Sequence, residues 1–133
     1  MKLVMDASAA VEIALDGRQS AKLSAVVSSA DVVLAPELLL AEVVNTVWKY
    51  HRFEKLELDK CERALKFVLQ LVPVLVSHAE LYSEAFLLSR AEPRRAAYDM
   101  FYLALAQRED AVLLTMDQSL KKEAARRGIR VAA

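Results

Sequence analysis

Short apolar runs alternate along the chain with longer segments of helical periodicity. The apolar runs cover residues 3–5, 32–35, 72–76 and 111–115, and a final short run covers residues 129–131. Runs of this length, bounded by charged or turn-forming residues, are typical of strands buried on both faces of a sheet. Strands that alternate with helices form parallel βαβ units. The pattern therefore predicts an α/β fold with three α/β/α layers and a central parallel sheet of about four to five short strands.

Helical patterns fill the intervals between these runs. They are expected at residues 10–15, 20–28, 37–51, 77–91, 95–106 and 120–127, with a further helix between the second and third strands that Asp59 caps. Leu58, Ala64, Leu65, Val68 and Leu69 form the predicted core side of that further helix. Pro36 is expected at the first position of the helix that follows the second strand. Gly17 and Gly128 follow helices and are expected to end them.

Two aspartates follow predicted strands directly. Asp6 comes after the first strand and Asp117 after the fourth. Right-handed crossovers bring the carboxyl ends of parallel strands to one edge of the sheet, and ligands bind at that edge. Aspartate before a helix is also a favoured N-cap, so each residue has an ordinary structural role as an alternative. The two roles are compatible, because one carboxylate oxygen can cap while the other binds a ligand.

A third acid lies within an apolar helical segment. Residues 95–106 are apolar on almost every face, which predicts a buried helix, and Asp99 lies in its first half. A buried carboxylate needs a cation, a hydrogen-bond donor or water, and pairing with a nearby arginine would be an ordinary explanation. Glu42 gives a weaker signal, because it shares the polar face of its helix with Asn45 and Lys49, and such faces are usually solvated.

Composition narrows the classes of protein that need to be considered. The 133 residues are 56% hydrophobic with only five glycines and prolines, which predicts one domain over residues 1–133. The net charge is zero, which argues against coating nucleic acid through bulk charge but leaves room for a local basic patch. The single cysteine excludes an intramolecular disulfide. No apolar run approaches the length of a membrane span, because charged residues interrupt every candidate, so we expect a cytoplasmic protein without membrane association.

The four acids could act together if the fold brings them to one place. Clustered carboxylates repel one another unless a cation compensates their charge. Oxygen-only ligands favour Mg²⁺ or Mn²⁺ over Zn²⁺. Such an ion lowers the pKa of bound water and neutralises charge on a phosphodiester in the transition state. This hypothesis is metal-assisted phosphodiester hydrolysis.

Four segments, in this order, resemble the motifs of a PIN domain, specifically the small VapC-type toxin ribonucleases. They are Val4-Met5-Asp6-Ala7-Ser8, then Pro36-Glu37 with Glu42-Val43-Val44-Asn45, then Tyr98-Asp99-Met100-Phe101-Tyr102-Leu103-Ala104-Leu105-Ala106, and finally Leu113-Leu114-Thr115-Met116-Asp117. The resemblance spans residues 3 to about 131. It implies that Asp6, Glu42, Asp99 and Asp117 form an acidic Mg²⁺ or Mn²⁺ site, supported by Ser8, Asn45 and Thr115. Some relatives carry another acid after the last motif, where this chain has Gln118-Ser119, so a second metal has less support than the first.

The resemblance also implies a function and partners. It implies a metal-dependent endoribonuclease that cleaves single-stranded RNA, forms a homodimer and is neutralised by a small cognate antitoxin. Arg90, Arg94 and Arg95 precede the third motif and are candidates for RNA contact, although a solvated loop is an equal alternative.

Two other functions remain open. A catalytically inactive PIN-like scaffold that binds RNA or protein is the first. A phospho-acceptor signalling domain has less support, because Asp6 has no acidic neighbour and no lysine follows residues 129–131.

Overall fold

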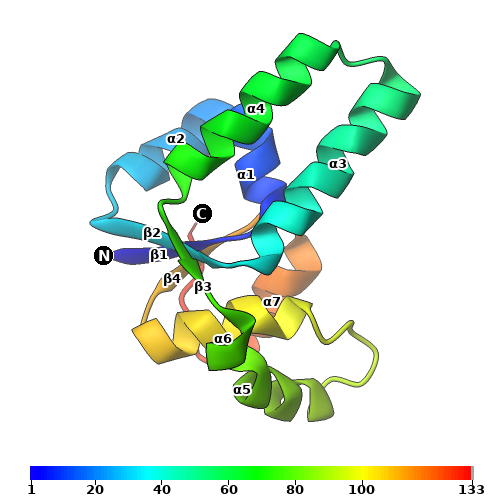
Figure 1. Ribbon diagram of the computed structural model, residues 1–133. Helices are drawn as coiled ribbons and strands as arrows, with labels where there is room; N and C mark the ends of the chain where they lie inside the picture. The colour runs from blue at the N-terminus through cyan, green and yellow to red at the C-terminus, as the bar shows by residue number, and fades with distance from the viewer. Residues whose placement is uncertain (133) are drawn as a thin grey trace.

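The protein is described by a computed structural model over residues 1–132 (Figure 1). Its elements, in chain order, are β1 (Lys2–Met5), α1 (Ala7–Ala14), α2 (Ser20–Ser28), β2 (Val32–Pro36), α3 (Leu38–Glu54), α4 (Leu58–Leu71), β3 (Val74–Val76), α5 (His78–Arg90), α6 (Asp99–Glu109), β4 (Val112–Leu114) and α7 (Gln118–Arg126). The four main strands and the alternation of strands with helices are confirmed.

The four strands form one parallel sheet in the order β3-β2-β1-β4. The central strand β1 pairs with β2 from Lys2↔Val32 and with β4 from Leu3↔Val112. The predicted fifth strand is reduced to an isolated bridge between Val131 and Leu113. Because all four strands run parallel, their carboxyl ends lie at one edge of the sheet.

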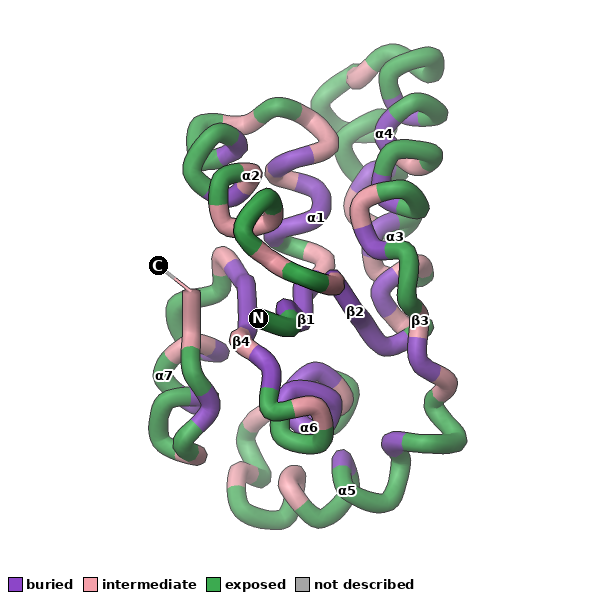
Figure 2. Tube along the Cα trace, turned by 90° about the vertical axis from the view of Figure 1, so that its left-hand side faces the viewer, coloured by how far each residue is buried: buried purple, intermediate pink, exposed green. Residues whose placement is uncertain are grey.

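Helices cover both faces of the sheet, as predicted. Helices α1 to α4 lie on one side and α5 to α7 on the other (Figure 1). Helix α6 packs directly on β1, β2 and β4 and lies beneath the sheet with its inner turns buried (Figure 2). Its side chains from Tyr102 to Ala106 are at most 2% exposed. The almost uniformly apolar sequence of this helix is explained by contact with the sheet on one side and with α5 on the other.

Some local predictions for helix starts and faces are wrong. Pro36 is the last residue of β2, where it pairs with Val76, and does not begin α3. Asp59 lies inside the first turn of α4 and pairs with Arg63, so the N-cap position belongs to Glu57. The buried face of α4 consists of Cys61, Ala64 and Val68, whereas Leu58 and Leu69 are exposed. This helix packs on α1 and α3 rather than on the sheet, so its buried stripe is narrow.

Helix α6 begins four residues later than predicted. The segment before it forms turns, so Asp99 is its first helical residue rather than an interior one. Pro93 and the preceding turn separate this segment from α5. The shift matters because it puts the Asp99 carboxylate at the start of the helix instead of in its interior, where α6 packs on the sheet.

None of the helices in the described part of the chain combines the length and the apolar character that crossing a bilayer requires.

Candidate active site

The two aspartates that follow β1 and β4 cap the next helices, as the sequence predicted. Asp6 caps α1, and its Oδ1 accepts the backbone N–H of Ala9 at 3.1 Å. Asp117 caps α7, and its Oδ1 accepts the N–H groups of Ser119 at 2.9 Å and Leu120 at 3.1 Å. Neighbouring parallel strands carry these residues, so the two carboxylates lie at the same edge of the sheet.

Hydroxyl groups hold both oxygens of Asp6. Ser8 donates to Oδ1 at 2.7 Å, and the hydroxyl of Thr115 donates to Oδ2. Thr115 also accepts the backbone N–H of Asp117 at 3.0 Å, which links the two strand ends. Burial raises the pKa of Asp6, as does the nearby charge of Asp117, whereas the hydrogen bonds from Thr115, Ser8 and Ala9 lower it. The hydroxyl groups therefore fix the orientation of the Asp6 carboxyl, and its burial makes ionisation unfavourable unless a nearby cation compensates the charge.

Glu42 extends from α3 into the same region. Its Oε1 accepts the hydroxyl proton of Tyr102 at 2.5 Å. Burial raises the pKa of Glu42, the Tyr102 hydrogen bond lowers it, and the charges of Asp99 and Asp6 raise it further. The helix thus turns Glu42 toward the other acids and leaves it half-buried, contrary to the solvated polar face that its sequence alone suggested.

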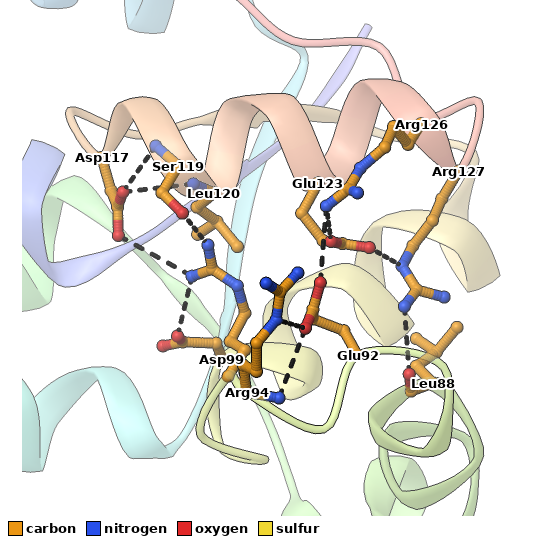
Figure 3. Close-up of polar contacts among 11 residues, drawn as sticks. Leu88, Glu92, Arg94, Asp99, Asp117, Ser119, Leu120, Glu123, Arg126 and Arg127 are labelled. Atoms are coloured by element: carbon orange, nitrogen blue, oxygen red, sulfur yellow. Dashed lines mark hydrogen bonds and ion pairs between the residues drawn. The ribbon is translucent and has the colours of Figure 1, made fainter.

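Asp99 is paired with a basic side chain from the turn before α6. Arg95 Nη1 donates to Asp99 Oδ2 at 3.0 Å and lies 4.0 Å from Asp117 Oδ2. Figure 3 shows Asp99 directed toward Asp117 at the start of α7. The ordinary explanation for Asp99, an arginine partner, is therefore present in the structure, and the same arginine reaches a second acid.

All four acids line one cavity of about 380 Å³ at this edge of the sheet. Ser8, Thr46, Tyr50 and Tyr102 contribute polar groups to its wall. Asn45 is exposed on α3 and is not among the lining residues, whereas its neighbour Thr46 is. Thr115 lies beneath the cavity, where it holds Asp6.

The donor set of this cavity consists of carboxylate and hydroxyl oxygens, which is the chemistry that Mg²⁺ and Mn²⁺ prefer. Among residues 1–132, however, no three His, Cys, Asp or Glu side chains are close enough together to hold one ion as they stand. Each acid instead has a protein donor: hydroxyls for Asp6 and Glu42, Arg95 for Asp99, and backbone N–H groups for Asp117. The residues fit a hard divalent ion in kind, and side-chain movement would be needed to bring them onto it.

The candidate RNA-contact arginines differ in their surroundings. Arg94 pairs with Glu92 at 3.2 Å and has an 87% exposed side chain. Arg95 is turned inward and its side chain is only 14% exposed. Both line a second cavity of about 550 Å³ beside the first, together with Asp99 and Arg126. Arg90 is the last residue of α5 and is exposed.

The sequence analysis missed the contact that Tyr102 makes at this site. Tyr102 follows Asp99 by three residues, so the two lie one turn apart on α6, and this spacing is the signal that could have identified it. The sequence analysis offered a nearby arginine as a partner for Asp99 but did not identify Arg95. The two residues are four apart, but the segment between them is not regular helix, so helical spacing does not indicate their contact.

Comparison with known proteins shows what the chain is similar to over nearly its whole length. The family model described as the PIN domain matches residues 3–125. Ribonuclease VapC3 of Pyrobaculum aerophilum is 32% identical over 125 residues, which is 92% of this chain and 95% of that protein. The crystal structure of PAE2754 from Pyrobaculum aerophilum aligns over 98% of this chain and 92% of its own, with a TM-score of 0.74 and 24% identity. VapBC2 from Rickettsia felis, bound to a DNA fragment from its promoter, aligns over 99% of this chain and 98% of its own, with a TM-score of 0.68 and 16% identity.

Proposed function

The chain belongs to the PIN-domain family, within which it is related to the VapC ribonucleases, and from this premise we propose that it is a metal-dependent endoribonuclease that cleaves single-stranded RNA. The observation that carries the proposal is the cavity at the carboxyl edge of the sheet. Four acids from four separate segments, Asp6, Glu42, Asp99 and Asp117, line it together, and a fifth acid, Glu12 on α1, lines it as well. Structural roles for single residues, such as helix capping, do not account for this convergence.

Asp6, Glu42, Asp99 and Asp117 are the proposed ligands of Mg²⁺ or Mn²⁺. A divalent ion held there supplies a lowered pKa for water and neutralises charge on the phosphodiester. Asp6 contributes a fixed orientation, since Ser8 and Thr115 hold both of its oxygens. Positive charge from an ion would also offset the burial that raises the pKa of Asp6 and Glu42, so both acids would ionise more readily.

The chain's other groups complete the proposed site. The hydroxyl of Tyr102 orients Glu42. Burial and the neighbouring acids raise the pKa of Tyr102, so its hydroxyl remains a hydrogen-bond donor at neutral pH. Arg94 and Arg95 line the neighbouring cavity, where they are positioned to contact RNA phosphates. Arg90, at the end of α5, is a further candidate for backbone contact.

The proposed protein partners are a cognate antitoxin and a second copy of this chain. The solved VapBC2 assembly, to which this fold is similar, supports an antitoxin partner. Large apolar side chains are exposed in two places that suit protein contacts. On α3 they are Trp48 and Phe53, and on α5 they are Tyr82, Phe86 and Leu87.

The test is cleavage of a labelled single-stranded RNA by purified protein freed of any antitoxin. We expect fragments with Mn²⁺ or Mg²⁺ and none with EDTA. Asp99→Asn should abolish cleavage while the protein stays folded, because it removes a charge at nearly constant shape; loss of the Arg95 ion pair should lower the melting temperature slightly. The matched control is Asp110→Asn, which makes the same change at a 97% exposed side chain. Full activity in Asp99→Asn would refute the assignment of this residue.

The alternative is a PIN-like scaffold that binds RNA or protein without cutting. The pairing of Asp99 with Arg95 favours this alternative, because the carboxylate already has a counter-ion in the structure. Binding of the same RNA without cleavage in either metal ion would support the scaffold and refute the enzyme.

A further inference from the structure

Arg95 is the one basic side chain whose guanidinium reaches two of the four acids among the contacts of residues 1–132. One nitrogen donates to Asp99 and lies near Asp117, and the other donates to the hydroxyl of Ser119. The partners belong to different elements, since Asp99 begins α6 while Asp117 and Ser119 lie at the start of α7. Asp99, Asp117 and Ser119 point into the same space in Figure 3. Arg95 therefore bridges two elements that both line the acidic cavity.

The burial of Arg95 distinguishes it from a surface arginine. Its side chain is 14% exposed, compared with 87% for Arg94, although both lie in the same turn-rich segment. An exposed ion pair contributes little, whereas a partly buried one interacts more strongly because water screens it less. The two arginines also differ in their ion-pair partners. Arg94 pairs with Glu92, whereas the acids near Arg95 are the two that line the acidic cavity. Arg95 is thus placed to compensate the repulsion between Asp99 and Asp117.

We propose that Arg95 holds the place of a divalent cation on Asp99 and Asp117, so that ion binding requires its displacement. This inference rests on the proposed function, in which the same two carboxylates bind the ion. A guanidinium and a metal ion repel each other and compete for the same carboxylate oxygens. The displaced side chain has space to occupy, because Arg95 also lines the second cavity of about 550 Å³. Metal affinity is therefore set partly by the strength of the Arg95 contacts.

The first test compares Mn²⁺ binding by calorimetry in metal-free wild type, Arg95→Met and Arg94→Met. Methionine keeps an unbranched stem and removes the charge. Arg94→Met is the matched control. It removes the same charge at the neighbouring position, where the side chain is exposed and pairs with Glu92 rather than with the acids of the cavity. We expect Arg95→Met to bind Mn²⁺ about tenfold more tightly than wild type, which corresponds to the loss of one partly buried ion pair. Arg94→Met should remain within about twofold of wild type, because charge at an exposed position is screened.

The outcomes separate this inference from the proposed function. If wild type binds Mn²⁺ and Arg95→Met binds no more tightly than Arg94→Met, the competition is refuted and the ion site stands. If neither wild type nor Arg95→Met binds Mn²⁺, both proposals fail. Binding that is detectable only in Arg95→Met would support the competition.

A second readout follows the side chain itself in the wild-type protein. Phenylglyoxal modifies free guanidinium groups, and mass spectrometry reports the extent at each arginine. We expect Arg95 to be protected without metal and to become several-fold more reactive with Mn²⁺, while Arg94 reacts equally in both conditions. Unchanged or lower reactivity of Arg95 with Mn²⁺ would show that its contacts persist and would overturn the proposal.

Discussion

Tyr102→Phe removes one hydroxyl group from the cavity wall and leaves the rest of the side chain in place. The tyrosine ring is 2% exposed, so phenylalanine fills the same space without creating a cavity. The lost group is the hydroxyl that donates to Glu42 Oε1 at 2.5 Å. The substitution therefore tests the contribution of a single hydrogen bond to a half-buried carboxylate.

The expected magnitude follows from the burial of Glu42. A hydrogen bond to a charged group contributes roughly 1.5–3 kcal/mol, but water reaches this half-buried carboxylate and replaces part of the loss. We expect a decrease of about 1 kcal/mol in the free energy of unfolding of the metal-free protein at pH 8. Because the Tyr102 bond lowers the pKa of Glu42, its removal should raise that pKa further above the ordinary value.

The pH dependence gives the sign of the effect. The folded-state pKa of Glu42 lies above its unfolded value of about 4.5, so its favourable contribution is present below that pH and is lost as pH rises through the folded pKa. In the variant this loss extends to higher pH. The difference in unfolding free energy between the two proteins should therefore be large at pH 8 and small near pH 4, where Glu42 is protonated in both.

The assay is urea unfolding of metal-free protein at both pH values, with RNA cleavage measured separately. Tyr82→Phe is the matched control, because this tyrosine is 65% exposed and its hydroxyl should contribute almost nothing. Cleavage should fall about 10–100-fold, as is typical when a group that orients a metal ligand is removed. An equal loss of stability at pH 8 and pH 4 would refute the reasoning, since it would place the effect in packing rather than in the charge of Glu42.

Two further substitutions address the stability of metal-free protein. Asp6→Asn removes a carboxyl whose raised pKa makes the fold lose stability as pH rises above about 3.8, so at pH 8 in EDTA the variant should unfold at a higher urea concentration than wild type. The same variant should lose the Mn²⁺-induced rise in melting temperature, and an undiminished rise would contradict its role as a ligand. Glu123→Gln removes a 4% exposed carboxylate that pairs with Arg126 and with Arg127 at 2.7 Å. Urea unfolding should show a loss of about 2 kcal/mol, less than for a fully buried pair because Arg126 is exposed; a loss below 0.5 kcal/mol would contradict this reading.

Several predictions that depend on short-range rules were confirmed, although those for Pro36 and Asp59 were wrong. Asp6 and Asp117 each follow a strand and begin a helix, so the local sequence was sufficient to place both at the carboxyl edge and to identify them as caps. Gly128 ends the last helical segment with a positive φ of 75°, as a glycine after a helix commonly does. Each of these features is determined by residues within one or two turns of chain.

Predictions that depend on packing between distant segments were less successful. Leu58 and Leu69 have the right spacing for a buried stripe on α4, but this helix packs mainly on α1 and α3, and both side chains remain exposed. The bond between Tyr102 and Glu42 joins residues 60 positions apart, and no periodicity in either helix indicates it. Among the site residues, Asn45 was suggested by its motif, yet the turn of α3 presents Thr46 to the cavity instead.

Helix α6 connects the candidate site to the hydrophobic core, so a change in core packing would alter the geometry of the site. Met100 and Leu103 are fully buried between α6 and its neighbours, while Asp99 and Tyr102, on the same helix, reach the acidic cavity. A shift of this helix would therefore move both groups at once and with them the partner of Glu42. Asp99 is the first residue of α6, where Arg95 contacts its carboxylate. In our proposal, a metal ion replaces Arg95 at this position. The buried helix α6 thus fixes the positions of Asp99 and Tyr102, and the segment before it carries Arg95, the cation that a metal ion would displace.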